Sequence, residues 1–183
     1  MQIGEIMRGA TVAKVIASKS TKVNEGDFVS TQSGWQEYAV VREGRFELVA
    51  SARETSHLFD HLSVLGSTGL TAYFGMTRIG EPKPGELVVI SGAAGATGSV
   101  AGQIAKLKGA RVVGIAGSDE KVKFLTSELG FDAALNYKAS DFKQQFKDAT
   151  KDYIDVFYDN GEHRSRRNPR RLTWWPWHVD GSL

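Results

Sequence analysis

Leu87-Val-Val-Ile-Ser-Gly-Ala-Ala-Gly-Ala-Thr-Gly-Ser99 is the stretch that decides the fold of this chain. Four apolar residues at 87–90 run into a loop with glycines at positions 92, 95 and 98, and a helical apolar pattern follows. That order is typical of a buried strand, a tight turn and a helix that begins at the turn. Small residues let the backbone approach a pyrophosphate, and a helix N-terminus offers it free N–H groups. We therefore interpret the loop as a phosphate-binding turn, with a glycine turn that binds no ligand as the alternative.

The alternation of strand and helix continues to residue 158. Strands are predicted at 87–91, 111–115, 133–135 and 153–158, and helices at 97–108, 119–129 and 141–149. This spacing predicts a parallel sheet with right-handed crossovers, in the spatial order 3-2-1-4. The predicted fold class is therefore α/β, with a partial doubly wound parallel sheet that forms a Rossmann-like half.

The sequence before residue 86 has a different pattern. Short apolar runs alternate with turn residues between positions 11 and 49, which predicts part of an antiparallel sheet. The runs are 12–16, 28–29, 35–41 and 46–49. Residues 55–79 are predicted to be helical in two pieces broken near Gly66 and Gly69, and Pro82-Lys83-Pro84-Gly85 ends that segment.

Composition places the chain among globular proteins. It has 183 residues, of which 41% are hydrophobic and 24% charged, enough for one ordinary domain or two small ones. No apolar run reaches the roughly 18 residues of a membrane span, and the N-terminus lacks the apolar core of a signal peptide. We therefore expect a cytoplasmic protein with no membrane partner. The absence of cysteine excludes disulfides and thiolate zinc sites.

Several segments together resemble one known group of enzymes. They are Gly34-Trp-Gln-Glu-Tyr-Ala-Val-Val41, Gly69-Leu-Thr-Ala-Tyr-Phe-Gly75, Ala93-Ala-Gly-Ala-Thr-Gly-Ser99, Gly102-Gln-Ile-Ala-Lys-Leu-Lys-Gly109, Val112-Val-Gly-Ile-Ala-Gly-Ser-Asp-Glu-Lys121, Leu129-Gly-Phe-Asp132 and Asn136-Tyr-Lys138. From about residue 3 to Asn160 the chain resembles the medium-chain dehydrogenase/reductase superfamily, and within it the zinc-independent, NADPH-dependent alkenal, leukotriene B4 and prostaglandin reductases.

The resemblance implies a domain plan. Residues 1–55 would be part of an antiparallel GroES-like substrate domain, 56–85 a connecting helical segment, and 86–161 a partial Rossmann NADP-binding domain. Residues 162–183 depart from the family and hold five of the eleven arginines and three of the four tryptophans. We expect this tail to be disordered, with nucleic-acid binding as the less favoured alternative. Family members are longer, so the chain resembles an internal slice of a reductase and we expect it not to turn over.

The resemblance also implies cofactor-binding residues. The family's pyrophosphate loop matches Gly95, Ala96, Thr97 and Gly98. Lys121 matches the lysine that meets the 2′-phosphate of NADPH, Tyr137 matches a tyrosine that contacts the nucleotide, and Asn160 matches a cofactor-contacting asparagine. Ordinary alternatives are a solvated helix lysine for Lys121 and an aromatic residue at a strand end for Tyr137.

The end of the second predicted strand indicates the cofactor. An NAD-specific site would place an acidic residue there to bind the ribose hydroxyls, whereas this chain has Ala116-Gly117-Ser118. Asp119 follows, but it begins a helix, where an acid complements the dipole. The small residues and Lys121 together predict NADPH rather than NADH.

Three further polar positions are weaker candidates. Thr71 is interpreted equally well as a residue near the nicotinamide or as an ordinary helix threonine. His57 and His61 lie four residues apart with Asp60 between them, which could be a metal pair, but no third ligand follows. A solvent-facing helix is favoured, and no metal is predicted.

The predicted function follows from the resemblance. Family members transfer hydride from NADPH to the carbon–carbon double bond of α,β-unsaturated ketones or aldehydes. The alternatives are a quinone reductase, and a non-catalytic nucleotide-binding fragment or interaction protein. No catalytic side chain can be named. The family is often homodimeric, and the oligomeric state of this chain stays open.

Overall fold

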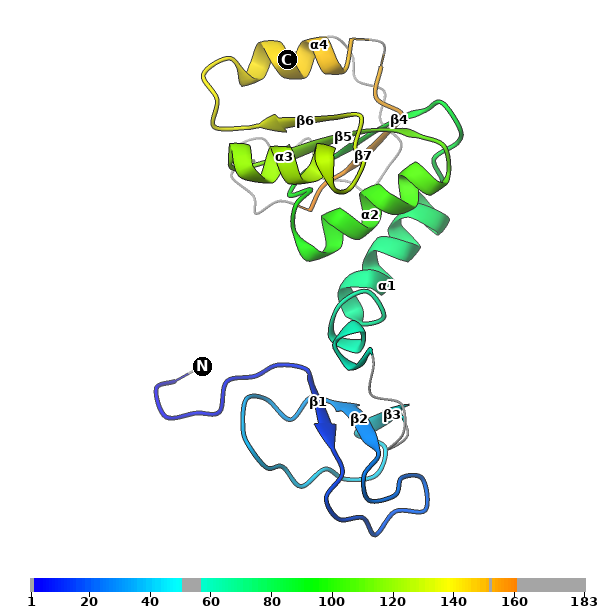
Figure 1. Ribbon diagram of the computed structural model, residues 1–183, viewed down its shortest axis with the longest axis vertical. Helices are drawn as coiled ribbons and strands as arrows, with labels where there is room; N and C mark the ends of the chain where they lie inside the picture. The colour runs from blue at the N-terminus through cyan, green and yellow to red at the C-terminus, as the bar shows by residue number, and fades with distance from the viewer. Residues whose placement is uncertain (1, 51–56, 152, 161–183) are drawn as a thin grey trace. The chain divides into compact units, whose positions relative to one another are not determined.

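The computed structural model describes residues 2–50, 57–151 and 153–160 (Figure 1). The predicted tail at 162–183 lies outside these residues. The chain divides into two compact units, Met1–Ser67 and Thr68–Leu183, which are described separately below. The boundary lies inside the segment predicted to connect the two domains.

The first unit contains a three-stranded antiparallel sheet in the order β1-β2-β3. Its strands are β1 (Thr11–Lys14), β2 (Phe28–Thr31) and β3 (Phe46–Ala50), with a register irregularity between Phe28 and Val29. The turn before β2 is closed by Asp27, whose Oδ2 accepts a hydrogen bond of 2.8 Å from the Asn24 N–H. The predicted antiparallel sheet is therefore present.

The prediction of a strand at 35–41 is wrong. Residues 35–41 form no strand, and the Trp35 N–H instead donates to the Met7 carbonyl at 2.9 Å. The turn before it needs Gly34, which has φ +77° and whose added Cβ would lie 2.6 Å from the Met7 oxygen. The apolar side chains of this run are largely exposed, as Trp35 is at 70%. Its alternation therefore does not mark a buried sheet face.

The helical segment is broken at one of the two predicted glycines. A short 3₁₀ turn, η1 (Leu58–Leu62), precedes α1 (Ser67–Phe74), and Gly66 lies between them as predicted. The predicted break near Gly69 is wrong because Gly69 is buried inside α1. The helix changes later, into the π-helical turn η2 (Gly75–Ile79). A Cβ at Gly75 would lie 2.5 Å from the Tyr158 ring, so close packing determines the use of glycine there.

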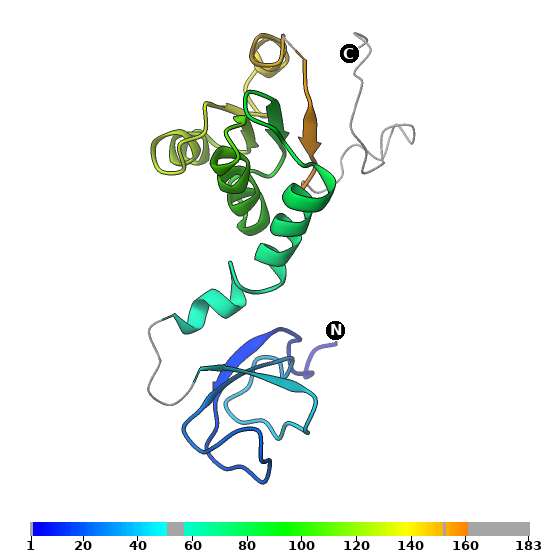
Figure 2. The same ribbon diagram turned by 90° about the vertical axis from the view of Figure 1, so that its right-hand side faces the viewer.

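The second unit is built on a four-stranded parallel sheet. Its elements are β4 (Leu87–Ile90), α2 (Ala96–Leu107), β5 (Arg111–Ala116), α3 (Asp119–Ser127), β6 (Ala133–Asn136), α4 (Phe142–Ala149) and β7 (Val156–Tyr158). The order β6-β5-β4-β7 is the predicted 3-2-1-4 arrangement, with β7 at one edge (Figure 2). The last strand begins later than predicted because Tyr153 has φ +119°, which a strand does not accommodate.

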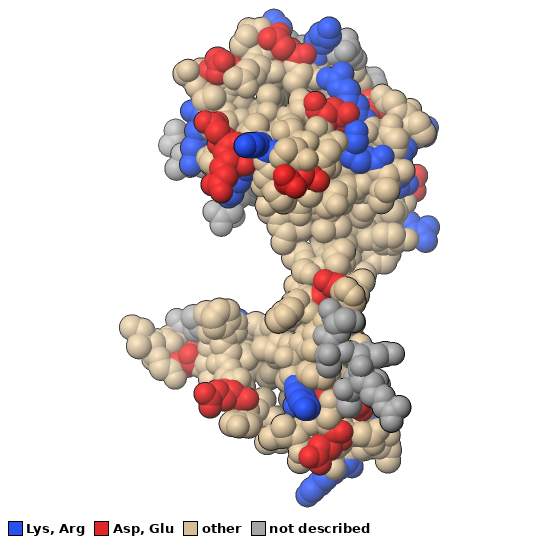
Figure 3. Space-filling view, viewed as in Figure 1, with Lys and Arg blue, Asp and Glu red and all other residues tan. Residues whose placement is uncertain are grey.

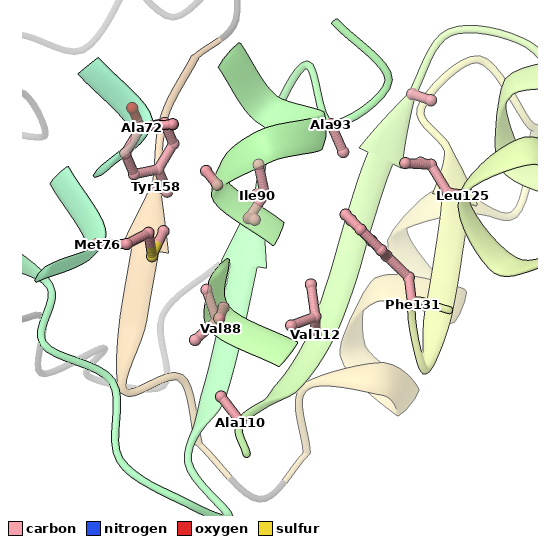
Figure 4. Close-up of a cluster of buried hydrophobic side chains, with 13 residues drawn as sticks. Ala72, Met76, Val88, Ile90, Ala93, Ala110, Val112, Leu125, Phe131 and Tyr158 are labelled. Carbon is pink, nitrogen blue, oxygen red and sulfur yellow. The ribbon is translucent and has the colours of Figure 1, made fainter. Parts of the chain in front are cut away.

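Both faces of the parallel sheet are covered, which explains the continuous apolar run at 87–90. Figure 4 shows the first face, where Val88, Ile90 and Val112 meet side chains from α1, η2 and the loop after α3. Ala101 and Ala105 of α2 pack against the same face. The second face packs against α4 and holds Leu87, Val89, Val113, Leu135 and Ile154.

The described surface carries both signs of charge. On the face shown in Figure 3, basic and acidic side chains of the second unit are interspersed rather than separated by sign. Within the described residues, no helix is both long enough and apolar enough to cross a lipid bilayer.

Candidate cofactor-binding site

The candidate site lies at the carboxyl edge of the parallel sheet. Because β4, β5, β6 and β7 are parallel, the loops that follow them meet at this edge. The chain leaves β4 to form β5 on one side, whereas β7 returns to the other side of β4. Open α/β sheets bind ligands at such a reversal of strand order. The loops after β4 and β7 are therefore the first place to look for a ligand site.

The loop after β4 is held tightly against the sheet. The Ala93 N–H donates to the Ile115 carbonyl at 3.0 Å, and the Gly95 N–H donates to the Gly92 carbonyl at 2.9 Å. A Cβ at Gly98 would lie 2.5 Å from the Gly92 oxygen and 2.9 Å from the Ala93 Cα. The first turn of α2 therefore packs backbone to backbone on the loop, and only glycine fits at position 98.

The N-terminus of α2 carries no cap of its own. Its N-cap residue is Gly95, no side chain of the described residues caps the first turn with a hydrogen bond, and that turn holds no acidic residue. Ala96 is exposed and Thr97 is partly exposed. An uncapped helix start has unsatisfied N–H groups and a partial positive charge. The predicted pyrophosphate residues thus form a backbone cradle that suits an anion.

The next helix along the same edge begins differently. The Ser118 hydroxyl accepts a hydrogen bond of 3.4 Å from the Lys121 N–H, and Asp119 and Glu120 occupy the first turn. This helix start is therefore capped by its own sequence. The Lys121 side chain is exposed, and among the described residues no carboxylate forms an ion pair with it.

Tyr137 lies beside the end of β5. Its N–H donates to the Ala116 carbonyl at 3.0 Å, and a Cβ at Gly117 would lie 3.0 Å from its ring. The ring is 54% exposed, so one side faces the protein and the other is accessible. The Lys138 ammonium lies 5.8 Å from the centre of the same ring. The structure therefore brings Tyr137 to the end of β5 together with a cation that the sequence did not single out.

A polar bridge that the sequence did not reveal joins the end of β6 to the start of α3. The Asn136 amide donates from Nδ2 to Asp119 Oδ1 at 2.7 Å, and Asn136 Oδ1 accepts from the Lys138 N–H at 3.0 Å. A polar side chain at the end of a buried strand is the signal that could have suggested Asn136. Its partner lies 17 positions away, so the pairing needs the fold.

Asn160 is anchored next to the glycine loop. Its N–H donates to the Ser91 hydroxyl at 2.8 Å, the Ser91 hydroxyl donates to the Asp159 carboxylate, and the Ser91 N–H donates to the Tyr158 carbonyl. The reversal of strand order thus places Asn160 beside the loop that begins α2. Ser91 and Asp159 were not identified from the sequence.

Thr71 lies on α1 against the last strand. Its carbonyl accepts a hydrogen bond of 3.4 Å from the Tyr158 hydroxyl. Burial raises the pKa of Tyr158, which keeps the phenol in its donating form. The described contact uses the backbone of Thr71, and the role of its side chain near a nicotinamide stays a prediction.

The two histidines lie four positions apart at η1. His57 precedes η1 and its Nδ1 lies 3.4 Å from Asp60 Oδ2, on an exposed surface. Across residues 2–50, 57–151 and 153–160, no three His, Cys, Asp or Glu side chains group as metal ligands. The described residues therefore do not fit a zinc ion, and the chain has no cysteine to bind one.

Comparison with known families gives two matches along the chain. Residues 1–49 match the family described as the N-terminal domain of oxidoreductase, and residues 96–165 match the family described as zinc-binding dehydrogenase. The name of the second family describes the family as a whole, and the described residues of this chain contain no group of three or more His, Cys, Asp or Glu side chains that could hold a metal ion.

Individual relatives are reductases. The Bacillus subtilis protein YfmJ, which carries the name of an NADP-dependent oxidoreductase, is 47% identical over 86% of this chain and 46% of its own length. The NADPH-dependent curcumin reductase of Escherichia coli is 41% identical over 87% of this chain and 46% of that protein. Prostaglandin reductase 1 of Bos taurus is 45% identical over 86% of this chain and 48% of its own length. The chain thus spans about half the length of the curated relatives it matches.

The solved structures agree with these relatives. CurA from Vibrio vulnificus has a TM-score of 0.83 and 40% identity, over 90% of this chain and 48% of that one. The structure of CurA in complex with NADPH has a TM-score of 0.82.

The four-stranded parallel sheet with its helices, together with the antiparallel sheet that precedes it in the sequence, confirms the predicted fold class, an α/β protein with a partial doubly wound sheet. The chain belongs to the medium-chain dehydrogenase/reductase superfamily.

Proposed function

We propose that this chain provides the adenosine- and pyrophosphate-binding part of an NADPH-dependent reductase. The observation that carries the proposal is the uncapped start of α2 at Gly95, beside a strand end made of small residues. Anions bind at such helix starts because N–H groups and the helix dipole both favour negative charge.

Each predicted residue has a role in this proposal. The N–H groups of Ala96 and Thr97 would donate to the pyrophosphate, while Gly98 lets the helix approach the loop. Lys121 would meet the 2′-phosphate, and Tyr137 would flank the adenosine ribose at the end of β5. Asn160, anchored by Ser91, would contact the cofactor beyond the pyrophosphate. When bound, NADPH supplies the hydride for the reduction.

We further propose an α,β-unsaturated ketone or aldehyde as the acceptor, reduced at its carbon–carbon double bond. Support comes from relatives that are named for reducing curcumin and prostaglandins. A quinone is the second candidate, because a quinone oxidoreductase of Pseudomonas syringae has 27% identity and a TM-score of 0.63.

The chain of 183 residues is proposed to bind the adenosine end of NADPH without turning it over. Its described parallel sheet has four strands, which correspond to the half of a doubly wound fold that binds adenosine and pyrophosphate. The second half of such a fold binds the nicotinamide, and positioning of its reacting carbon can contribute about 7–11 kcal/mol to a reaction.

Two measurements on the purified chain test the proposal. Calorimetric titration should give tighter binding of NADPH than of NADH, and binding of 2′,5′-ADP close to that of NADPH. Absorbance of NADPH with an alkenal, an enone or a quinone should stay at the level of buffer. Equal affinity for the two dinucleotides would contradict the proposed cofactor, and clear turnover would contradict the proposed division of the site. The same assay would identify the acceptor class if turnover occurs.

A further inference from the structure

An acidic side chain lies where the proposed function needs positive charge. Asp119 opens α3 directly after the strand end that would receive the 2′-phosphate, two positions before Lys121. A free carboxylate there would repel a phosphate, or would bind ribose hydroxyls as the acid of an NAD site does. The proposed function therefore requires that the Asp119 carboxylate be kept from repelling the 2′-phosphate.

The structure holds this carboxylate in a defined place. Asp119 Oδ1 accepts the 2.7 Å hydrogen bond from Asn136 Nδ2, at the neighbouring strand end. The other end of the Asn136 amide is also used, because its Oδ1 accepts from the Lys138 N–H at 3.0 Å. A neutral amide can donate to the carboxylate and accept from the backbone at once. An aspartate at this position has the same shape, but its carboxylate could only accept from the backbone N–H.

The same amide also orders the cationic side of the site. By fixing the backbone at Lys138, Asn136 sets the turn that carries Tyr137 against Gly117 and the Lys138 ammonium at 5.8 Å from the Tyr137 ring. Lys121 and Lys138 are thus the cations of this edge, and Asp119 is its restrained anion.

Building on the proposed function, we propose that Asn136 is a specificity-determining residue for the 2′-phosphate. It holds the Asp119 carboxylate at the end of β6 and keeps the Tyr137–Lys138 turn in place, so that the edge favours a 2′-phosphate over a free 2′-hydroxyl. Asn136 acts through its neighbours and is a positioning residue.

The decisive variant is Asn136→Asp, which changes one amide to a carboxylate of the same shape. It replaces the donor to Asp119 by a second negative charge and adds repulsion at the phosphate edge. The readout is the ratio of affinities for 2′,5′-ADP and 5′-ADP, which differ only in the 2′-phosphate. The ratio should fall about tenfold, as expected for loss of a charged hydrogen bond and gain of a like charge. The affinity for 5′-ADP should change by less than about twofold.

A matched control lies on the opposite face of the sheet. Gln144 of α4 also donates from its amide to a carboxylate, that of Asp148, at 2.9 Å. Gln144→Glu therefore adds the same charge in the same kind of pair, away from the phosphate edge, and should leave the ratio unchanged. Asn136→Ala removes the bridge without adding charge and should lower the ratio about threefold, which keeps the inference testable if Asn136→Asp folds poorly.

The outcomes separate this inference from the proposed function. A wild-type chain that binds 2′,5′-ADP no better than 5′-ADP would contradict the proposed cofactor itself. A wild type that prefers 2′,5′-ADP, with an unchanged ratio in Asn136→Asp and in Asn136→Ala, would overturn only the role of Asn136. Equal loss of both ligands would also overturn it, because a merely structural residue would weaken both. Recovery of the ratio when Asp119→Asn is added to Asn136→Asp would support it.

Discussion

The two helices that begin at the carboxyl edge of the sheet start in opposite ways. At the start of α2 the N-cap is a glycine, no side chain in the described part of the chain caps the turn, and no acid lies in it. At the start of α3 the Ser118 side chain caps the turn, and Asp119 and Glu120 complement the dipole. Both starts face the same sheet edge, so the difference lies in the sequence and not in the fold.

The difference separates a helix start that is stabilised by its own sequence from one whose N–H groups are open to a ligand. A cap and acidic first-turn residues each stabilise a helix by about 0.3–2 kcal/mol. The start of α2 lacks this stabilisation, and an anionic ligand bound to its N–H groups can provide it. The start of α3 keeps it, and leaves only the Lys121 side chain to meet a phosphate.

The largest effect is expected from Gly98→Ala in α2. The new Cβ would lie 2.5 Å from the Gly92 oxygen, so backbone must move. We expect a loss of about 3 kcal/mol in the free energy of unfolding, as for severe overpacking. Denaturant unfolding followed by circular dichroism measures it. The control is Gly95→Ala, where φ is −81° and the Cβ would be 3.1 Å from the same oxygen, so the cost should be below about 1 kcal/mol. Equal costs would show that the loop is not packed as described.

A cap introduced into α2 should remove nucleotide binding. Gly95→Asp places a carboxylate on the open N–H groups, and the backbone angles of −81° and 170° suit a capping residue. We expect about a hundredfold weaker binding of 2′,5′-ADP, because the new charge occupies the anion site and repels the ligand. Helix content should be kept.

Gly95→Asn is the matched control for that prediction. It can cap the same N–H groups without a charge, so its loss of affinity should be about tenfold. Unchanged binding in Gly95→Asp would contradict the assignment of this helix start as the pyrophosphate site.

The third prediction concerns Lys121 on the capped helix. Lys121→Glu should weaken the binding of 2′,5′-ADP by about 2 kcal/mol, the size of a charge-assisted hydrogen bond. The affinity for 5′-ADP should change little. Lys123→Glu makes the same charge change two positions further along α3 and should have a small effect on both ligands. Calorimetry distinguishes the two variants. Similar effects of both changes would mean that the lysines act only through overall charge.

Much of the fold around the two helix starts could be predicted from the sequence. The apolar run at 87–90 and the glycines after it are local signals, and they gave the strand, the loop and the start of α2 correctly. The alternation of elements that followed gave the strand order, because crossover handedness leaves few topologies. Helix and strand bounds differ from the prediction by one or two residues for most elements of the second unit.

What could not be predicted depends on partners that are distant in sequence. Asn136 bridges to Asp119, and Ser91 holds Asn160, across separations of 17 and 69 positions that no local pattern encodes. Gly69 looked like a helix break, yet a buried helix surface uses it as a small residue. The run at 35–41 alternates like a strand, but tertiary contacts of Trp35 with the backbone at Met7 override that pattern.

Removing the cap of α3 should affect stability and leave the pyrophosphate site intact. Ser118→Ala deletes the acceptor for the Lys121 N–H, and we expect about 1 kcal/mol of destabilisation. Ser127→Ala is the control at the other end of α3, where the hydroxyl donates to the Lys123 carbonyl and removal should cost less. Binding of 5′-ADP should be unchanged in both. If Ser118→Ala weakened 5′-ADP strongly, the two helix starts would not have separate roles.

The smallest effect is expected at Asp132, which lies away from both helix starts. Burial opposes ionisation of this carboxylate, but hydrogen bonds from Lys106 at 2.8 Å and from the Val112 N–H at 2.6 Å outweigh it, so its pKa is lowered. A lowered pKa contributes stability above the ordinary aspartate value, and that contribution is lost as pH falls through the folded pKa. Asp132→Asn should therefore cost about 0.5 kcal/mol near pH 7, and the difference should shrink as the pH falls below about 4 and vanish once the pH is below the lowered pKa of the folded state.

The measurement for Asp132 is unfolding of wild type and Asp132→Asn in denaturant across that pH range. Lys106→Met removes the other partner and should show the same pH dependence, because both variants break one ion pair. Neither variant should change the affinity for 2′,5′-ADP, since the pair ties α2 to the residue just before β6, at the amino edge of the sheet. A cost that persists unchanged at low pH would mean that Asp132 stabilises the fold through hydrogen bonds that do not need its charge.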